Sequence, residues 1–147
     1  AVWLALALFR LGRGDEGHEV LHALLPAAHA PACYQAEPYV LAADVYANPQ
    51  HPGRGGWSWY TGAAGWFYRT AVEELLGLRV REGRLYMEPC LPQAWSGYEA
   101  EWALTSGCLH LKIERTGTRG LLLDGKPCGD GMPWNQLRGE HQVLFSF

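Results

Sequence analysis

The residues best suited to chemistry lie in one glycine- and aromatic-rich stretch, residues 53–68. A run of small residues leads to Thr61 and Gly62, and a helix-compatible pattern follows them. Small residues let a backbone approach a ligand closely, and the start of a helix offers free N–H groups to an anion. This order predicts an anion site at Thr61 and Gly62. The alternative interpretation is a tightly packed helix start around an aromatic core.

Aromatic and polar side chains near this helix start are candidates for binding a sugar, because a sugar ring presents C–H patches to a flat apolar face and hydroxyl groups at its edge. The sugar-binding candidates are Glu37, Tyr39, Arg54, Trp57, Trp59 and Tyr60.

Two carboxylates, those of Glu37 and Asp44, lie among apolar residues. A carboxylate is costly to bury without a partner. We therefore expect each to bind a ligand hydroxyl or to pair with a basic residue such as Arg54. His51 and Arg54 themselves either face a ligand or occupy exposed loop positions.

The composition is that of a globular chain that binds neither nucleic acid nor an anionic membrane. The 147 residues are 48% hydrophobic and 18% charged, and the net charge is −3. The four cysteines show no C-x-x-C spacing, which argues against zinc and against a disulfide framework. His18 and His22 have a helical metal-ligand spacing, but no third ligand follows from the sequence. We expect no metal and no cofactor.

The first half of the sequence is helical in pattern. Residues 2–11 are apolar on nearly every side, and residues 16–25 form a second helix with Asp15 as N-cap, which predicts an αα-hairpin. Residues 26–36 are expected to be a loop. Further predictions are a short buried helix over residues 37–46, a Pro- and Gly-rich loop over residues 48–56 and a long helix over residues 62–76 that ends at Gly77.

After Gly77 the pattern becomes that of short strands. Strands are predicted over residues 84–88, 99–104, 108–115, 121–123 and 141–147, with a hairpin at Asp124-Gly125. His110 lies on the polar face of its strand and is expected to be solvated. The sequence therefore predicts a helical segment, residues 1–77, followed by an antiparallel β module of about five strands, residues 78–147, built as a sandwich.

The helical segment has too few helices to close its own core, so we expect it to be the C-terminal part of a longer chain. Its first apolar run is too short to span a bilayer and lacks the features of a signal peptide.

Several motifs together resemble a known family. They are Glu37-Pro38-Tyr39, Ala43-Asp44-Val45-Tyr46, residues 53–65 and the run Glu88-Pro89-Cys90-Leu91-Pro92-Gln93-Ala94-Trp95. The chain resembles, from Ala1 to about Leu123, the C-terminal end of the inverting glycoside phosphorylases of glycoside hydrolase family 94. It is most similar to the phosphorylase-like region of bacterial cyclic β-1,2-glucan synthases. The sequence after Gly125 matches only loosely.

The resemblance implies that residues 1–77 are the last helices of an (α/α)6 catalytic barrel. It implies reversible phosphorolysis of a β-glucan, with inorganic phosphate as co-substrate and glucose 1-phosphate as product. The family's phosphate-binding Thr-Gly pair corresponds to Thr61 and Gly62. Its general-acid Asp and a phosphate-binding His would lie upstream of Ala1, so the catalytic set is incomplete here and the chain by itself is expected to be inactive.

Two functions stay open at this stage. The first is that of a phosphorylase part that holds phosphate and sugar. The second is a non-catalytic region of a cyclic β-1,2-glucan synthase that binds glucan or controls its chain length. The expected partners are a β-glucan oligosaccharide, phosphate and the upstream barrel. A membrane enters only through a preceding synthase portion, which would place the protein at the inner membrane or its cytoplasmic face.

Overall fold

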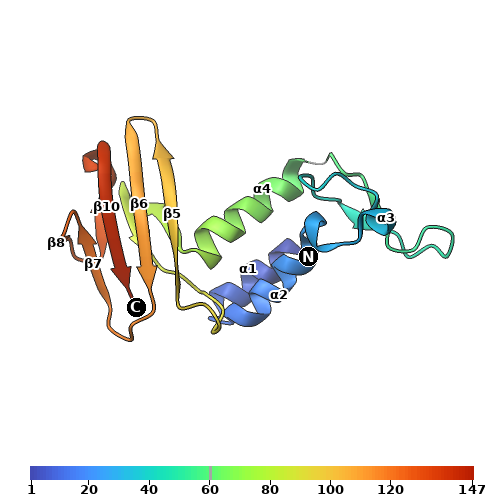
Figure 1. The fold of residues 1–147 in the computed structure, drawn as a ribbon, viewed down its shortest axis with the longest axis horizontal. Helices are drawn as coiled ribbons and strands as arrows, with labels where there is room; N and C mark the ends of the chain where they lie inside the picture. Colours follow the sequence, from blue (N-terminus) through green and yellow to red (C-terminus); the bar gives the residue numbers. More distant parts are fainter. Residues whose placement is uncertain (60) are drawn as a thin grey trace. The chain divides into compact units, whose positions relative to one another are not determined.

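The structure is a computed structural model, and it describes every residue except Tyr60; the side chain of Thr61 is also outside the described part. The chain divides into two compact units, Ala1–Leu75 and Leu76–Phe147. The first is built mainly from helices and the second from strands (Figure 1). Among the described residues, no helix is both long enough and apolar enough to cross a bilayer.

The first unit opens with two helices, α1 (Val2–Arg10) and α2 (Gly14–Leu24), which pack against each other as predicted. Close approach depends on Gly17, because a Cβ there would lie 2.7 Å from the ring of Phe9. The predicted N-cap was wrong. Arg13 occupies that position but its side chain makes no capping hydrogen bond, and Asp15 lies in the first turn, where the helix dipole favours its charge.

The segment after α2 differs most from the prediction. Two short helical turns, η1 (Pro26–Ala28) and α3 (Pro31–Tyr34), replace the expected loop, and each begins at a proline, which suits the first helical position.

The expected buried helix over residues 37–46 is also wrong. Its end forms β1 (Asp44–Val45), which pairs antiparallel with β2 (Gly55–Gly56). This long-range pairing overrides the local apolar pattern.

The long third helix is confirmed. It consists of α4 (Thr61–Arg69), continued by the wider turns of η2 (Thr70–Leu75). In the second unit, Gly77 has the left-handed backbone (φ +75°) expected of a residue that ends a helix.

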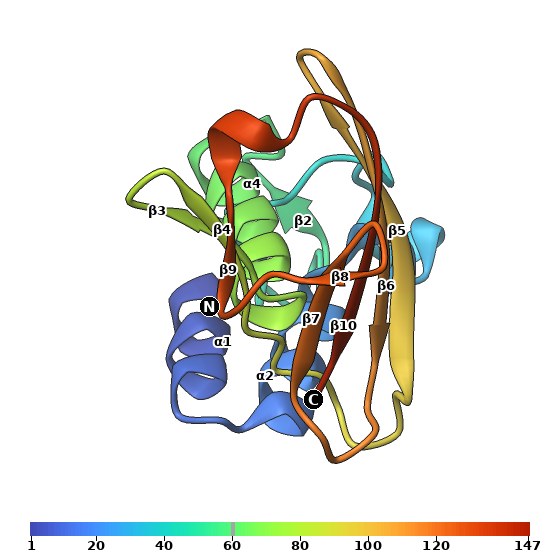
Figure 2. The same ribbon diagram turned by 90° about the vertical axis from the view of Figure 1, so that its left-hand side faces the viewer.

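The second unit contains two sheets. The five-stranded sheet has the order β5-β6-β10-β7-β8, and the three-stranded sheet has the order β3-β4-β9 (Figure 2). The strands are β3 (Leu78–Arg81), β4 (Arg84–Met87), β5 (Gly97–Leu104), β6 (Gly107–Glu114), β7 (Gly120–Leu123), β8 (Lys126–Pro127), β9 (Gly131–Pro133) and β10 (Gly139–Ser146); η3 (Trp134–Gln136) precedes β10.

Five of these strands match the predicted ones to within two residues, and the hairpin at Asp124 and Gly125 is confirmed by their positive φ values of 50° and 76°. Strands β3 and β9 were not predicted. The expectation of purely antiparallel pairing was wrong, because β10 runs parallel to β6. The predicted alternation of β6 is confirmed, since Leu109, Leu111 and Ile113 are all buried.

Candidate functional site

The start of α4 is open. Gly62 is exposed, and a Cβ added there would meet no atom within 4 Å. The first turn carries no acidic residue. Thr61 is the first residue of the helix. The described residues of the first unit therefore do not require glycine at position 62, and the helix start has the dipole sign for an anion.

Beside this helix start, three predicted residues form a cluster. The indole Nε1 of Trp59 donates a hydrogen bond of 3.3 Å to Oε1 of Glu37. The rings of Tyr39 and Trp59 lie edge to face, with centroids 6.2 Å apart. Tyr39 and Trp59 are 76% and 65% exposed, so their rings are accessible to a ligand. Glu37 thus takes an indole as partner, where we expected a ligand hydroxyl or a basic residue.

The other predicted residues are exposed and farther along the loop. Trp57 is 66% exposed and has a positive φ of 52°. Arg54 is exposed, and its carbonyl accepts a hydrogen bond of 2.8 Å from the backbone of Tyr46. Asp44 is also exposed, which corrects the expectation that its carboxylate is buried among apolar residues. Tyr60 lies outside the described residues.

A hollow of about 280 Å³ in the first unit is lined by Asp44 and by Ala63 of α4, among other residues. It is also lined by His29 and Tyr34, whose rings stack with centroids 4.7 Å apart. Neither residue was predicted, because both lie in a segment that reads as a loop. Arg54, Trp57 and Trp59 do not line this hollow.

The histidines also differ from expectation. The rings of His18 and His22 lie 6.1 Å apart, and within the described part of the chain no third potential ligand joins them. His110 was expected to be solvated, but it is half-buried and its Nε2 lies 2.8 Å from Oε2 of Glu140.

The side chain of Cys108 lies close to these two groups, on the same sheet. Partial burial, and then the charges of Glu140 and Glu101, raise the pKa of the Cys108 thiol. No disulfide bond joins any of the four cysteines in the part of the chain that the structure describes.

Comparison with known families divides the chain at the same place as its change from helix to strand. Residues 1–77 match the catalytic domain of the glycosyl hydrolase 94 superfamily. Residues 78–128 match the C-terminal domain of glycosyl hydrolase family 65.

The chain is also similar to individual proteins. The chain is 40% identical over 125 residues (82% of the chain) to the cyclic β-(1,2)-glucan synthase NdvB of Rhizobium meliloti strain 1021. It is 30% identical over 149 residues (96% of the chain) to the N,N′-diacetylchitobiose phosphorylase of Vibrio furnissii. It is 30% identical over 132 residues (83% of the chain) to the solabiose phosphorylase of Paenibacillus borealis. The chain spans only 4%, 18% and 17% of these three relatives, respectively.

Proposed function

Because the chain belongs to the glycosyl hydrolase 94 superfamily, we propose that it is part of an enzyme that cleaves β-glucans by inverting phosphorolysis. Inorganic phosphate attacks the anomeric carbon, the glycosidic oxygen leaves, and glucose 1-phosphate is released. The similarity to two phosphorylases supports this reaction type. The resemblance to a cyclic β-(1,2)-glucan synthase supports a β-1,2-linked substrate.

The observation that carries the proposal is the open start of α4. An anion placed beside exposed Gly62 meets backbone N–H groups at the positive end of the helix dipole, and no described side chain lies within 4 Å of a Cβ placed at position 62. In this proposal the hydroxyl of Thr61 donates a further hydrogen bond to phosphate. Such charge-assisted bonds hold the nucleophile in position for attack.

The cluster of Glu37, Tyr39 and Trp59 supplies the sugar contact in this proposal. Glu37 fixes the indole of Trp59 through its hydrogen bond, and the exposed aromatic faces are left free to pack against a sugar ring. Trp57 and Arg54 extend this surface along the loop.

The catalytic acid comes from outside this chain segment. We place α1, α2 and α4 among the last helices of an (α/α)6 barrel, and the second unit as a sandwich-like module. In this arrangement the exposed apolar residues of α1 and of its C-cap pack against preceding helices of the same protein; they are Trp3, Leu4 and Leu11.

The test is to incubate the intact protein with short β-1,2-glucans and inorganic phosphate and to measure glucose 1-phosphate. Phosphate-dependent release is the expected result. Cellobiose and chitobiose serve as substrates of other linkage or sugar type, and omission of phosphate is the control. Folded protein that releases neither glucose 1-phosphate from the glucans or cellobiose nor N-acetylglucosamine 1-phosphate from N,N′-diacetylchitobiose contradicts the proposal.

A second function is favoured by one observation, the exposure of Tyr39, Trp57 and Trp59, which suits glucan binding with or without catalysis. In that case the region binds glucan or controls chain length within a synthase. Glucan binding by a protein that never uses phosphate would select this second function.

A further inference from the structure

Three strands of the second unit bring metal-ligand side chains to one face of the five-stranded sheet. Cys108 and His110 alternate along β6 with Leu109 and Leu111, which are buried. Because successive side chains of a strand point to opposite faces, Cys108 and His110 both project to the more accessible face of the sheet. The parallel strand β10 places Glu140 directly opposite Cys108. The antiparallel strand β5 places Glu101 directly opposite His110.

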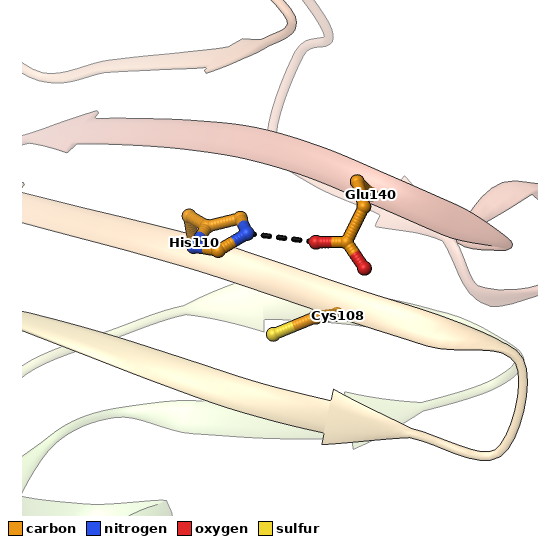
Figure 3. Close-up of side chains that lie close together, drawn as sticks. All are labelled: Cys108, His110 and Glu140. Carbon is orange, nitrogen blue, oxygen red and sulfur yellow. Dashed lines mark hydrogen bonds and ion pairs between the residues drawn. The ribbon is translucent and has the colours of Figure 1, made fainter.

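The side chains converge as the register requires. One potential ligand atom from each of Cys108, His110 and Glu140 lies within 4.8 Å of the other two (Figure 3). The Nε2 of His110 is 2.8 Å from Oε2 of Glu140, and its Nδ1 is 3.6 Å from Oε1 of Glu101. His110 and Glu101 also line a hollow of about 410 Å³ on this face, which leaves access from solvent.

The donor set selects the kind of ion. A cysteine sulfur, an imidazole nitrogen and a carboxylate oxygen are the three side-chain ligand types of zinc sites, whereas Mg²⁺ and Ca²⁺ take oxygen ligands. We propose that Cys108, His110 and Glu140 bind a Zn²⁺ ion, with Glu101 beside the other ring nitrogen of His110, where a carboxylate orients a metal-binding imidazole. This site is separate from the phosphorolysis proposed above and does not depend on it.

Binding requires only local changes. The Cys108 thiol releases its proton to solvent and the sulfur binds as thiolate, because the thiolate is the form that ligates metal. Glu140 and His110 exchange their mutual hydrogen bond for bonds to the ion. Because the ligands come from β6 and β10, the ion joins the parallel strand pair, whose segments are far apart in sequence.

Cobalt is the probe, since Co²⁺ occupies zinc sites and gives a near-ultraviolet charge-transfer band when a thiolate ligates it. The intact protein, stripped of metal, is titrated with Co²⁺ and then with Zn²⁺. We expect a thiolate–cobalt band that Zn²⁺ abolishes. Cys108→Ser should lose that band, and His110→Gln should weaken Co²⁺ binding at least tenfold. For comparison, loss of an outer-shell partner costs about 10–100-fold in metal affinity.

Two matched controls separate this site from other ligands on the chain. Cys33→Ser removes an exposed thiol, and the double change His18→Gln with His22→Gln removes the histidine pair of α2. Both should leave the cobalt band and the affinity unchanged. The proposal is overturned if the native protein gives no thiolate–cobalt band, or if either control abolishes the band while Cys108→Ser keeps it.

A second variant guards against misfolding at position 108. Glu140→Gln changes an exposed side chain, keeps its shape and removes only its charge. Zn²⁺ affinity measured against a chelating dye should fall about tenfold or more in Glu140→Gln, and Zn²⁺ should raise the melting temperature of the native protein more than that of this variant. Equal affinities in the two proteins would also overturn the proposal.

Discussion

Arg10 of α1 holds the carboxylate of Glu74 in η2, 64 positions away in sequence. The guanidinium Nε and Nη2 atoms lie 3.0 Å and 2.9 Å from the same oxygen, Oε1. Glu74 is only 3% exposed, whereas the Arg10 side chain is 62% exposed. The pair therefore links the first and last helical segments of the first unit and compensates a carboxylate that has been taken out of water.

Replacing Arg10 by Met should lower the free energy of unfolding by about 1–3 kcal/mol, because a buried carboxylate then loses a charge-assisted partner. Arg13→Met is the matched control, since Arg13 and Glu16 form an exposed pair whose loss should cost less than about 1 kcal/mol. Urea denaturation of both variants measures the difference. Equal losses would show that burial of Glu74 does not matter.

Thr61→Val should weaken the use of phosphate by about 1–3 kcal/mol, the cost of an unmade hydrogen bond to a charged ligand. The measurement is the phosphate dependence of glucose 1-phosphate release by the intact protein. Thr105→Val, in the exposed turn between β5 and β6, is the control and should have no effect. Unchanged phosphate kinetics in Thr61→Val would remove this residue from the site.

Trp59→Phe keeps an aromatic face but removes the N–H group that bonds Glu37. Glucan affinity should fall by about 1 kcal/mol, because the ring is no longer held in one orientation. Calorimetric titration with β-1,2-glucan checks this. Trp102→Phe, in β5 of the second unit, should bind glucan as the native protein does. A native affinity in Trp59→Phe would show that the hydrogen bond to Glu37 has no role in binding.

The pair of His141 and Asp124 should make stability depend on pH. The hydrogen bond to Asp124 raises the pKa of His141 above 6.5. Hydrogen bonds from the backbone of Gln142 and from His141 lower the pKa of Asp124 below 3.8. The contribution of His141 to folding stability is therefore complete below pH 6.5 and is lost as pH rises through the raised pKa of His141. The aspartate contribution is complete above pH 3.8 and is lost as pH falls.

Asp124→Asn should consequently destabilise the protein most between about pH 3.8 and 6.5, with a smaller difference from the native protein at higher pH. Denaturation midpoints of Asp124→Asn and of the native protein, compared within this pH range and above it, measure the effect. Asp130→Asn, at an exposed position, supplies the control. A difference between native protein and Asp124→Asn that is flat across pH would contradict the assignment.

Gly107→Ala should break the start of the parallel pair. Gly107 pairs with Gly139, and a Cβ at position 107 would overlap the carbonyl oxygen of Gly139. We expect a loss of at least about 2 kcal/mol in unfolding free energy. Gly117→Ala tests backbone strain alone, because Gly117 has φ +79° but open space around it; its cost should be about 1 kcal/mol. Similar losses in the two variants would show that the close contact is unimportant.

Local pattern was enough to predict the elements that depend on near neighbours in sequence. The apolar period of residues 62–76 predicted the third helix, and the alternation around Leu109 and Leu111 predicted β6 and its buried face. The Asp124-Gly125 hairpin was also predictable, because few residue types tolerate a positive φ. The family resemblance likewise rested on motifs that can be read directly from the sequence.

Only the tertiary structure decided the features that join distant segments. The pairing of Asp44 with Gly56 turned a predicted helix into a strand, and the parallel pairing of β10 with β6 could not be inferred from alternation, which is the same for either direction. The bond between Trp59 and Glu37 and the convergence of Cys108, His110 and Glu140 arise in the same way. Residue type and spacing within one element determine which face a side chain occupies, but the register between elements determines what it meets there.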